Sequence, residues 1–489
     1  MNSLKDNIYA CIEVGSFEIK LGVYNIREER FYVLSQKEVP SVGIEAGKIT
    51  NFDQLVTQIK QVKQAVESDL GQPLKQIILC IAPIDVQIEA VIGKINLDVN
   101  HPIQTADIRK LFRQVMTNSH DEAYLPIQLV PRLFRIDESN VVQNPHNITG
   151  MKLGFEGQRI LSPITVASNL VHAVESAGFK ISDVTVGSIA ETLMAIDSPQ
   201  LFMRMCHINI GHTSSTISIV HEGKVFNTQV LSIGGRDFTQ KIMEVFNIEE
   251  NVADELKINF GRFNSQPNEQ TDEQIIYIQD VENETVRMTR KMLDQIMHQQ
   301  CHHLFKVIKN HLVERLRLKE DEYHFILTGG GAAIPSLIDA ATLYLGSQVK
   351  IESPTMLGVR HPKYNQVVAM AVFAHELTLL IGAKKTQLQF ETSNAVEKTQ
   401  MKQEAVVEAQ NDVHVPYITA SDEQLTNVSI PDTINHTMKI YGADDDMTDI
   451  EQEELDIKER YSNKKLENSG VLVKLFDMIF NENNDAQGS

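Results

Sequence analysis

The residues best suited to chemistry in this chain stand at tight turns between apolar runs. Gly15 and Ser16 join two strand-like stretches, residues 9–14 and 20–24. Glycine lets the backbone approach a ligand closely, and the backbone N–H groups and the Ser16 hydroxyl can donate to phosphate oxygens. Lys20 adds a positive charge nearby. The pattern is typical of a phosphate-binding hairpin, although one such turn alone is more often purely structural.

Two later turns have related chemistry. In the second, Asn209 and Gly211 precede the hydroxyl-bearing Ser214 and Ser215. In the third, the glycine triplet Gly329, Gly330 and Gly331 follows a strand-like run, residues 323–327, and precedes a helix-like stretch from residue 334. Bare backbone at a strand-to-helix turn can pack against a phosphate or a planar base. A tight packing turn is an equally good interpretation of the triplet taken alone.

The elements that must position these turns repeat along the chain. Residues 76–81, 207–210, 216–220 and 225–231 are strand-like, whereas residues 55–70 and 238–246 have the apolar spacing of helices. A strand–turn–strand start followed by a helix therefore occurs twice. The sequence predicts two related α/β halves.

Composition narrows the class of protein. The chain has 489 residues, of which 42% are hydrophobic and 22% charged, with a net charge of −20. This acidity argues against a general nucleic-acid binder. The four cysteines are widely spaced, so we expect reduced, buried thiols in a cytosolic protein. We expect no signal peptide and no membrane-spanning segment, and we assign no metal ligands.

The three turns, in this order, resemble the phosphate loop one, phosphate loop two and adenosine loop of the actin/Hsp70-like ATPase superfamily. Within it the chain is most similar to the FtsA family of actin-like bacterial cell-division proteins. The similarity extends over about residues 8–383. It rests also on residues 42–49, 147–154, 231–239, 252–261 and 358–362.

The resemblance implies an α/β, two-lobed actin-like ATPase fold with an inserted subdomain of the 1C type. We expect the first lobe at residues 1–83 and 163–198, the insertion at 84–162 and the second lobe at 199–385. A disordered acidic linker would follow at 386–469, and an amphipathic membrane-targeting helix at 470–481.

The resemblance also implies ligands for the cleft between the lobes, which would bind ATP with Mg²⁺. By position, Glu13, Gly15, Ser16 and Lys20 would line the first loop, and Asn209, Gly211, Ser214 and Ser215 the second. Asp254 and Lys257 would meet the ribose and base, with Gly329, Gly330 and Gly331 under the adenine.

The chain departs from the superfamily pattern where hydrolysis is concerned. Related ATPases carry Asp where this chain has Glu13 and Asn209, and those carboxylates organise the metal's hydration shell and the attacking water. Their water-orienting Gln or Glu would fall near residues 187–188, and we give little weight to Glu191, the nearest acid. We therefore expect nucleotide binding but at most weak ATPase activity, and we assign no catalytic residue.

The last part of the chain has a different composition. Residues 386–469 contain 18 acidic and 7 basic residues and show no sustained apolar period, which is typical of a disordered linker. Beyond it, the apolar residues have the spacing of one helical face: Leu472, Leu475, Phe476, Ile479 and Phe480. Such a helix must either dock on the protein itself or lie in a membrane interface, and the resemblance favours the membrane.

The resemblance implies the function of a cell-division adaptor at the cytoplasmic face of the membrane, at the septum. It would bind ATP, self-associate, contact other division proteins and tether filaments of the tubulin-like protein FtsZ by their C-terminal peptide. Two alternatives stay open. One is an actin-like scaffold of the pilus-assembly type, and the other is an enzyme of the same superfamily that resembles a sugar kinase.

Overall fold

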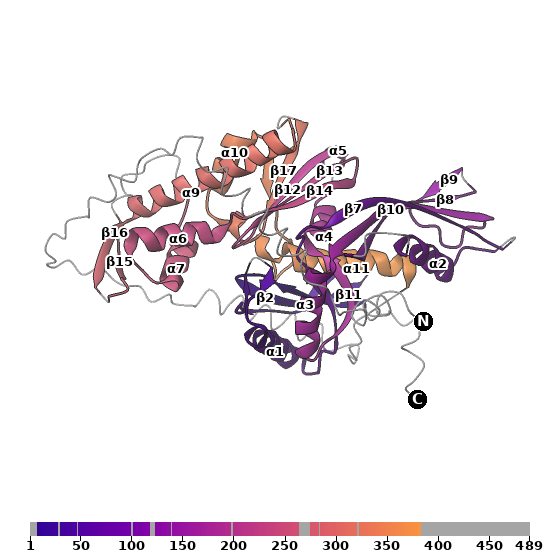
Figure 1. Ribbon diagram of the computed structural model, residues 1–489, viewed down its shortest axis with the longest axis horizontal. Helices are drawn as coiled ribbons and strands as arrows, with labels where there is room; N and C mark the ends of the chain where they lie inside the picture. The colour runs from indigo at the N-terminus through magenta and orange to yellow at the C-terminus, as the bar shows by residue number, and fades with distance from the viewer. Residues whose placement is uncertain are drawn as a thin grey trace.

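The computed structural model describes residues 7–27, 30–45, 47–98, 101–117, 123–137, 139–196, 199–263, 274–282, 284–319 and 322–382. The predicted linker at 386–469 and the predicted amphipathic helix at 470–481 lie outside the described residues. Within them the chain forms two α/β lobes and an additional subdomain, arranged along one long axis (Figure 1).

The first lobe is built on a five-stranded sheet with the order β11-β6-β1-β2-β3. Alternate side chains of β1 point to opposite faces, and both faces are buried. One face packs on helices α1 and α3, and the other on α11. Burial on both faces explains the nearly continuous apolar runs in these strands. The bounds are β1 (Ile8–Val14), β2 (Glu18–Arg27), β3 (Arg30–Pro40), β6 (Gln76–Ile81), β11 (Lys180–Val186), α1 (Phe52–Leu70), α3 (Ile164–Ser176) and α11 (Asn365–Ile381).

The second lobe repeats this plan with the sheet order β14-β13-β12-β17-β18. In each lobe three antiparallel strands are followed by a strand that pairs in parallel with the first and by another that pairs in parallel with that one, which confirms the prediction of two related halves. The bounds are β12 (Arg204–Ile210), β13 (Ser215–His221), β14 (Lys224–Leu231), β17 (His324–Thr328), β18 (Val349–Ile351) and α10 (Leu337–Leu345).

Two short helices, α4 (Gly187–Met194) and α5 (Pro199–Met203), lie between the lobes in the sequence. The α4 helix packs against α11 of the first lobe and against β13 and β14 of the second. The chain thus passes from one lobe to the other through an element that contacts both.

A helical region extends the second lobe to one end of the molecule (Figure 1). It consists of α6 (Gly235–Phe246), α7 (Glu250–Phe260) and α9 (Arg290–Asn310), with the antiparallel pair β15 (Ile275–Gln279) and β16 (Thr285–Thr289). A π-helical turn, His311–Arg315, continues α9.

The additional subdomain lies at the other end (Figure 1). Its sheet has the order β7-β10-β8-β9 and packs on α2 around Phe112, Phe134 and Phe155. The bounds are β7 (Gln87–Asn96), α2 (Thr105–Met116), β8 (Tyr124–Ile136), β9 (Asn140–Val142) and β10 (Lys152–Pro163). The small hairpin β4 (Ile44–Glu45) and β5 (Lys48–Ile49) precedes α1 in the first lobe.

The segment Pro362–Ile381, which includes α11, is long and apolar enough to cross a membrane on length and composition alone. Its side chains Val367, Val368, Met370 and Ala371 are nevertheless fully buried against the first-lobe sheet. This packing is that of a core helix.

Candidate functional site

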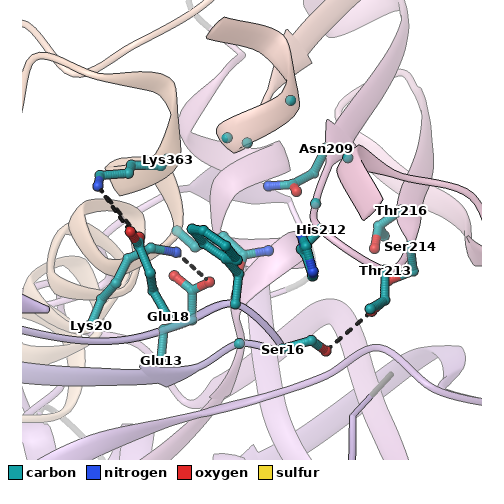
Figure 2. A pocket seen from close by; sticks show the side chains of 18 of the residues that line it. Glu13, Ser16, Glu18, Lys20, Asn209, His212, Thr213, Ser214, Thr216 and Lys363 are labelled. Carbon is teal, nitrogen blue, oxygen red and sulfur yellow. Dashed lines mark hydrogen bonds and ion pairs between the residues drawn. The ribbon is translucent and has the colours of Figure 1, made fainter. Parts of the chain in front are cut away.

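A cavity of about 390 Å³ lies between the two lobes. Both hairpin tips, the glycine triplet and the start of the last helical segment contribute to its wall (Figure 2). The predicted site residues that line it are Glu13, Gly15, Ser16, Lys20, Asn209, Gly211, Ser214, Lys257, Gly329, Gly330 and Gly331. The fold thus brings three turns that are far apart in the sequence around one space.

The two hairpin tips have the same backbone connection. The Gly15 N–H donates to the Glu18 carbonyl at 3.1 Å, and the Gly211 N–H donates to the Ser214 carbonyl at 2.9 Å. The tips also meet directly, because the Thr213 hydroxyl donates to Ser16 Oγ at 3.1 Å (Figure 2). In this structure the first and second lobes are therefore in contact at the two turns.

An aromatic contact reinforces this junction. The rings of Phe17 and His212 lie 4.8 Å apart between centroids. Burial lowers the pKa of His212 to about 4, and the nearby Lys257 charge acts in the same direction. The His212 ring is therefore neutral at physiological pH.

Glu13 and Lys20 form a charged pair that joins the first two strands at the cavity. Among the residues that the structure describes, it is the only such pair there. The two residues are directly opposite each other in the β1–β2 register, with Lys20 Nζ 2.9 Å from Glu13 Oε1. Burial alone would lower the pKa of Lys20, but the charge and hydrogen bond of Glu13 outweigh it and raise the pKa. Lys20 therefore stays charged inside the cavity wall.

The third turn depends on glycine at its first position. Gly329 has φ +83°, and a Cβ there would lie 2.4 Å from the Ile210 carbonyl oxygen and 2.7 Å from Asn209 Oδ1. Only glycine fits this conformation without strain. The turn continues as the 3₁₀ segment Gly330–Ala333, and α10 begins only at Leu337. The helix predicted from residue 334 thus starts three residues later.

Lys257 lines the cavity, but its ammonium group is already saturated. It donates to the Gly235 carbonyl, the Thr239 hydroxyl and the Asp254 carboxylate. These acceptors use all three N–H bonds of the lysine. Lys257 and Asp254 thus tie α6 to α7.

Two predicted residues do not line the cavity. Ser215 is fully buried and donates its hydroxyl to the Ile233 carbonyl at 2.7 Å, and Asp254 is turned toward Thr239 and Lys257. Their predicted roles toward a ligand have no direct geometric support here.

Several wall residues were absent from the prediction. Lys363 follows Pro362 at the start of the last helical segment. It donates to Glu18 at the cavity edge (Figure 2) and also to Glu38. Burial raises the pKa of Glu18, and the Glu38 charge adds to the effect while Lys363 opposes it. No local signal marks Lys363, because its partners precede it by more than 300 positions.

The sequence did contain a signal for Glu191. A lone acid in an apolar helical stretch must be buried with a partner. Glu191 is 1% exposed, and the Asn209 side-chain amide donates to its Oε2 at 2.8 Å. Burial raises the pKa of Glu191 to about 8, although hydrogen bonds from Thr328 and Asn209 act against this. Glu191, to which we gave little weight on the sequence alone, thus contacts Asn209 just before the second hairpin tip.

Two family models match this chain. "Cell division protein FtsA" matches residues 206–369, and "SHS2 domain inserted in FTSA" matches residues 85–161. The second match covers the additional subdomain with α2 and the sheet β7-β10-β8-β9.

Curated relatives agree with these matches. Cell division protein FtsA of Bacillus subtilis is 24% identical over 381 residues, which is 78% of this chain and 86% of the relative. The protein of the same name from Streptococcus pneumoniae is also 24% identical, over 76% of this chain and 81% of the relative.

Among solved structures, a chain of the PilM–PilN type IV pilus biogenesis complex has a TM-score of 0.50 and 13% identity. The match covers 75% of this chain and 98% of that one. At this identity the likeness concerns the fold alone, and it supports the two-lobed actin-like architecture with an inserted subdomain.

Proposed function

This chain belongs to the FtsA family, and we propose that it is a cell-division adaptor that binds ATP and tethers FtsZ filaments to the membrane at the septum. It would self-associate and act at the cytoplasmic face. The observation that carries the proposal is the meeting of both hairpin tips and the glycine turn around one cavity.

The residues around the cavity fit a nucleotide. The Gly15 and Gly211 turns and the Gly329 turn expose backbone close to the space, as binding of phosphates and a planar base requires. Lys20 supplies a positive charge. Glu13 Oε2 is buried and has no hydrogen-bond partner among the described residues, so it can accept from a water molecule of a bound Mg²⁺.

The same residues argue for slow hydrolysis. Asn209 offers an amide where related ATPases offer a carboxylate, and one oxygen of Glu13 is engaged by Lys20 at 2.9 Å. Mg²⁺, when bound, would neutralise phosphate charge. The two acids that line the cavity, Glu13 and Glu18, are each already paired with a lysine, Lys20 and Lys363. Binding rather than turnover would then be the role of ATP.

The partner and membrane roles extend the family resemblance. The FtsZ C-terminal peptide would bind the helical region at about residues 237–321, and other division proteins would bind elsewhere on the chain. Leu472, Leu475, Phe476, Ile479 and Phe480 would anchor the chain in the membrane surface. One helix binds weakly, so self-association would strengthen anchoring through multivalency.

Co-sedimentation with anionic liposomes tests the tether. We expect the full chain to pellet with liposomes and a chain ending at Gly470 to stay in solution. Phe476→Asp should weaken pelleting, whereas the control Asp477→Asn, which leaves the apolar face intact, should preserve it. Equal pelleting of the full and truncated chains would exclude the tether.

Binding of an FtsZ C-terminal peptide, measured by fluorescence anisotropy, tests the partner. Saturable binding by both the full and truncated chains is expected. Absence of binding up to high micromolar peptide would contradict the FtsZ role and would favour a scaffold of another type.

A further inference from the structure

A buried polar cluster lies behind the second phosphate loop, outside the cavity itself. Glu191 stands in the second turn of α4, and its carboxyl group accepts from the Asn209 amide at 2.8 Å. Asn209 lines the cavity, whereas Glu191 does not. The acid can therefore affect a ligand only through its neighbour.

The hydrogen bond sets the direction of the Asn209 amide. Its Nδ2 is used by Glu191, and its Oδ1 faces Gly329, 2.7 Å from the position that a Cβ would take there. The reverse orientation would place the amide oxygen against a carboxyl oxygen, which is unfavourable. Asn209 thus presents its oxygen on the side of the glycine turn.

The surrounding contacts hold Glu191 in place. Asn209 is paired with Thr328 in the β12–β17 register, and His207, two residues earlier, contacts Thr192 at 2.9 Å and Thr328 at 3.0 Å. Burial lowers the pKa of His207 to about 3, so this ring is a neutral link. Helix α4, which joins the lobes, is thereby tied to β12 and β17, the strands that lead into the second and third turns.

The Glu191 carboxyl group is fully buried, and Thr328 as well as Asn209 hydrogen-bonds it. A carboxylate at position 209 would be costly, because burial already keeps Glu191 protonated, with its pKa raised to about 8, and two carboxyl groups in one desolvated space cannot both ionise. The cluster therefore accommodates one carboxyl group and one amide, but not two carboxylates.

We propose that Glu191 is a positioning residue for the second phosphate loop: it accepts from the Asn209 amide and so turns the neutral amide oxygen toward the glycine turn and the cavity. The inference rests on the proposed nucleotide binding and specifies it. With a neutral oxygen beside the phosphates, the site repels a nucleotide less than a carboxylate would. Nucleotide affinity should accordingly depend only weakly on a divalent cation.

The amide of Asn209 and the carboxyl group of Glu191 can be exchanged by two nearly isosteric substitutions. This reversed pair provides a test that needs no ligand. Asn209→Asp alone sets two carboxyl groups against each other and should lower the Tm by about 2–8 °C. Adding Glu191→Gln restores one amide and one carboxyl group in exchanged positions and should recover most of that loss. At a pH where Glu191 is protonated in both states, Glu191→Gln alone retains an acceptor and should stay close to the wild-type Tm. A double variant no more stable than Asn209→Asp would overturn the pairing.

The second readout is nucleotide affinity of the full chain, measured with ATP in Mg²⁺ and in EDTA. For the wild type, the Kd in EDTA divided by the Kd in Mg²⁺ should be small. The reversed pair, with a carboxylate at the cavity, should raise this ratio about tenfold. Equal ratios for both proteins would overturn the positioning role. If no protein binds ATP, the nucleotide proposal fails, while the Tm rescue still decides whether Glu191 and Asn209 act as a pair.

Discussion

Glu13 and Lys20 face each other directly across the first hairpin, with Lys20 Nζ 2.9 Å from Glu13 Oε1. Both side chains are mostly buried, at 14% and 11% exposure. The cavity therefore contains a fixed charge pair in which the acid keeps the lysine ionised, and in the proposed nucleotide site this lysine would contact an added phosphate.

Removal of the lysine should affect both stability and binding. Lys20→Ala leaves the Glu13 carboxylate buried and unpaired, so we expect a loss of about 3 kcal/mol in unfolding free energy and ATP binding at least about tenfold weaker. Urea unfolding and calorimetry measure the two effects. The control Lys37→Ala breaks a half-exposed pair with Asp69 and should cost less than about 1 kcal/mol. Equal effects of the two variants would contradict this account.

The glycine triplet should tolerate substitution unequally. Gly329→Ala forces a Cβ into contact with Ile210 and Asn209 at positive φ, so a loss of about 1–3 kcal/mol is expected. Gly330→Ala meets nothing within 4 Å and is the matched control, with a change below about 1 kcal/mol. Denaturant titration distinguishes them. If Gly330→Ala were the more damaging change, the described turn would be wrong.

Stability should depend on pH through Glu191. Its pKa is raised to about 8 in the folded chain, above the usual range of an unfolded glutamate, so the folded state binds the proton more tightly. The contribution of this bound proton to the free energy of unfolding is therefore fully present below about pH 4.5, and it is lost as the pH rises toward about 8. Unfolding free energy of the wild type, minus that of Glu191→Gln, should fall over this window. A difference that is flat, or that rises with pH, would refute a protonated buried acid.

The contact between the hairpin tips predicts a kinetic effect. A phosphate chain cannot enter between Ser16 and Thr213 while their hydroxyls are 3.1 Å apart, so the tips must separate first. Phe17→Ala removes the ring contact with His212 and should speed association of a fluorescent ATP analogue in stopped-flow mixing. Phe226→Ala, on a ring that is 77% exposed on β14, serves as control and should leave the rate unchanged. A slower rate for Phe17→Ala would argue against a barrier at the tips.

Much of the site could be predicted because its turns are local features. Glycine and hydroxyl residues between apolar runs predicted both hairpin tips, and the direct pairing of Glu13 with Lys20 follows from a short hairpin. The start of α10 was predicted less well. Ser336, the residue before α10, has φ +61°, a left-handed conformation that cannot be part of the helix, so the helix begins only at Leu337.

What could not be predicted depends on contacts between distant segments. Lys257 donates to Thr239, Gly235 and Asp254, so it is not a free donor for a ligand. The sequence spacing between Lys257 and Asp254 did not indicate this set of contacts. The pairing of Glu191 with Asn209 requires α4 to lie under β12, which follows from packing of the two lobes rather than from any motif. Residues 470–481 remain a prediction from apolar spacing.

The central claim, a cleft that binds nucleotide without efficient turnover, is tested most directly by calorimetry of the full chain with Mg-ATP, with phosphate release followed in the same sample. We expect saturable binding of one nucleotide per chain and almost no phosphate release, with binding strongly weakened in Lys20→Ala. Absence of any binding heat at several temperatures, or release that keeps pace with an active ATPase, would contradict the account.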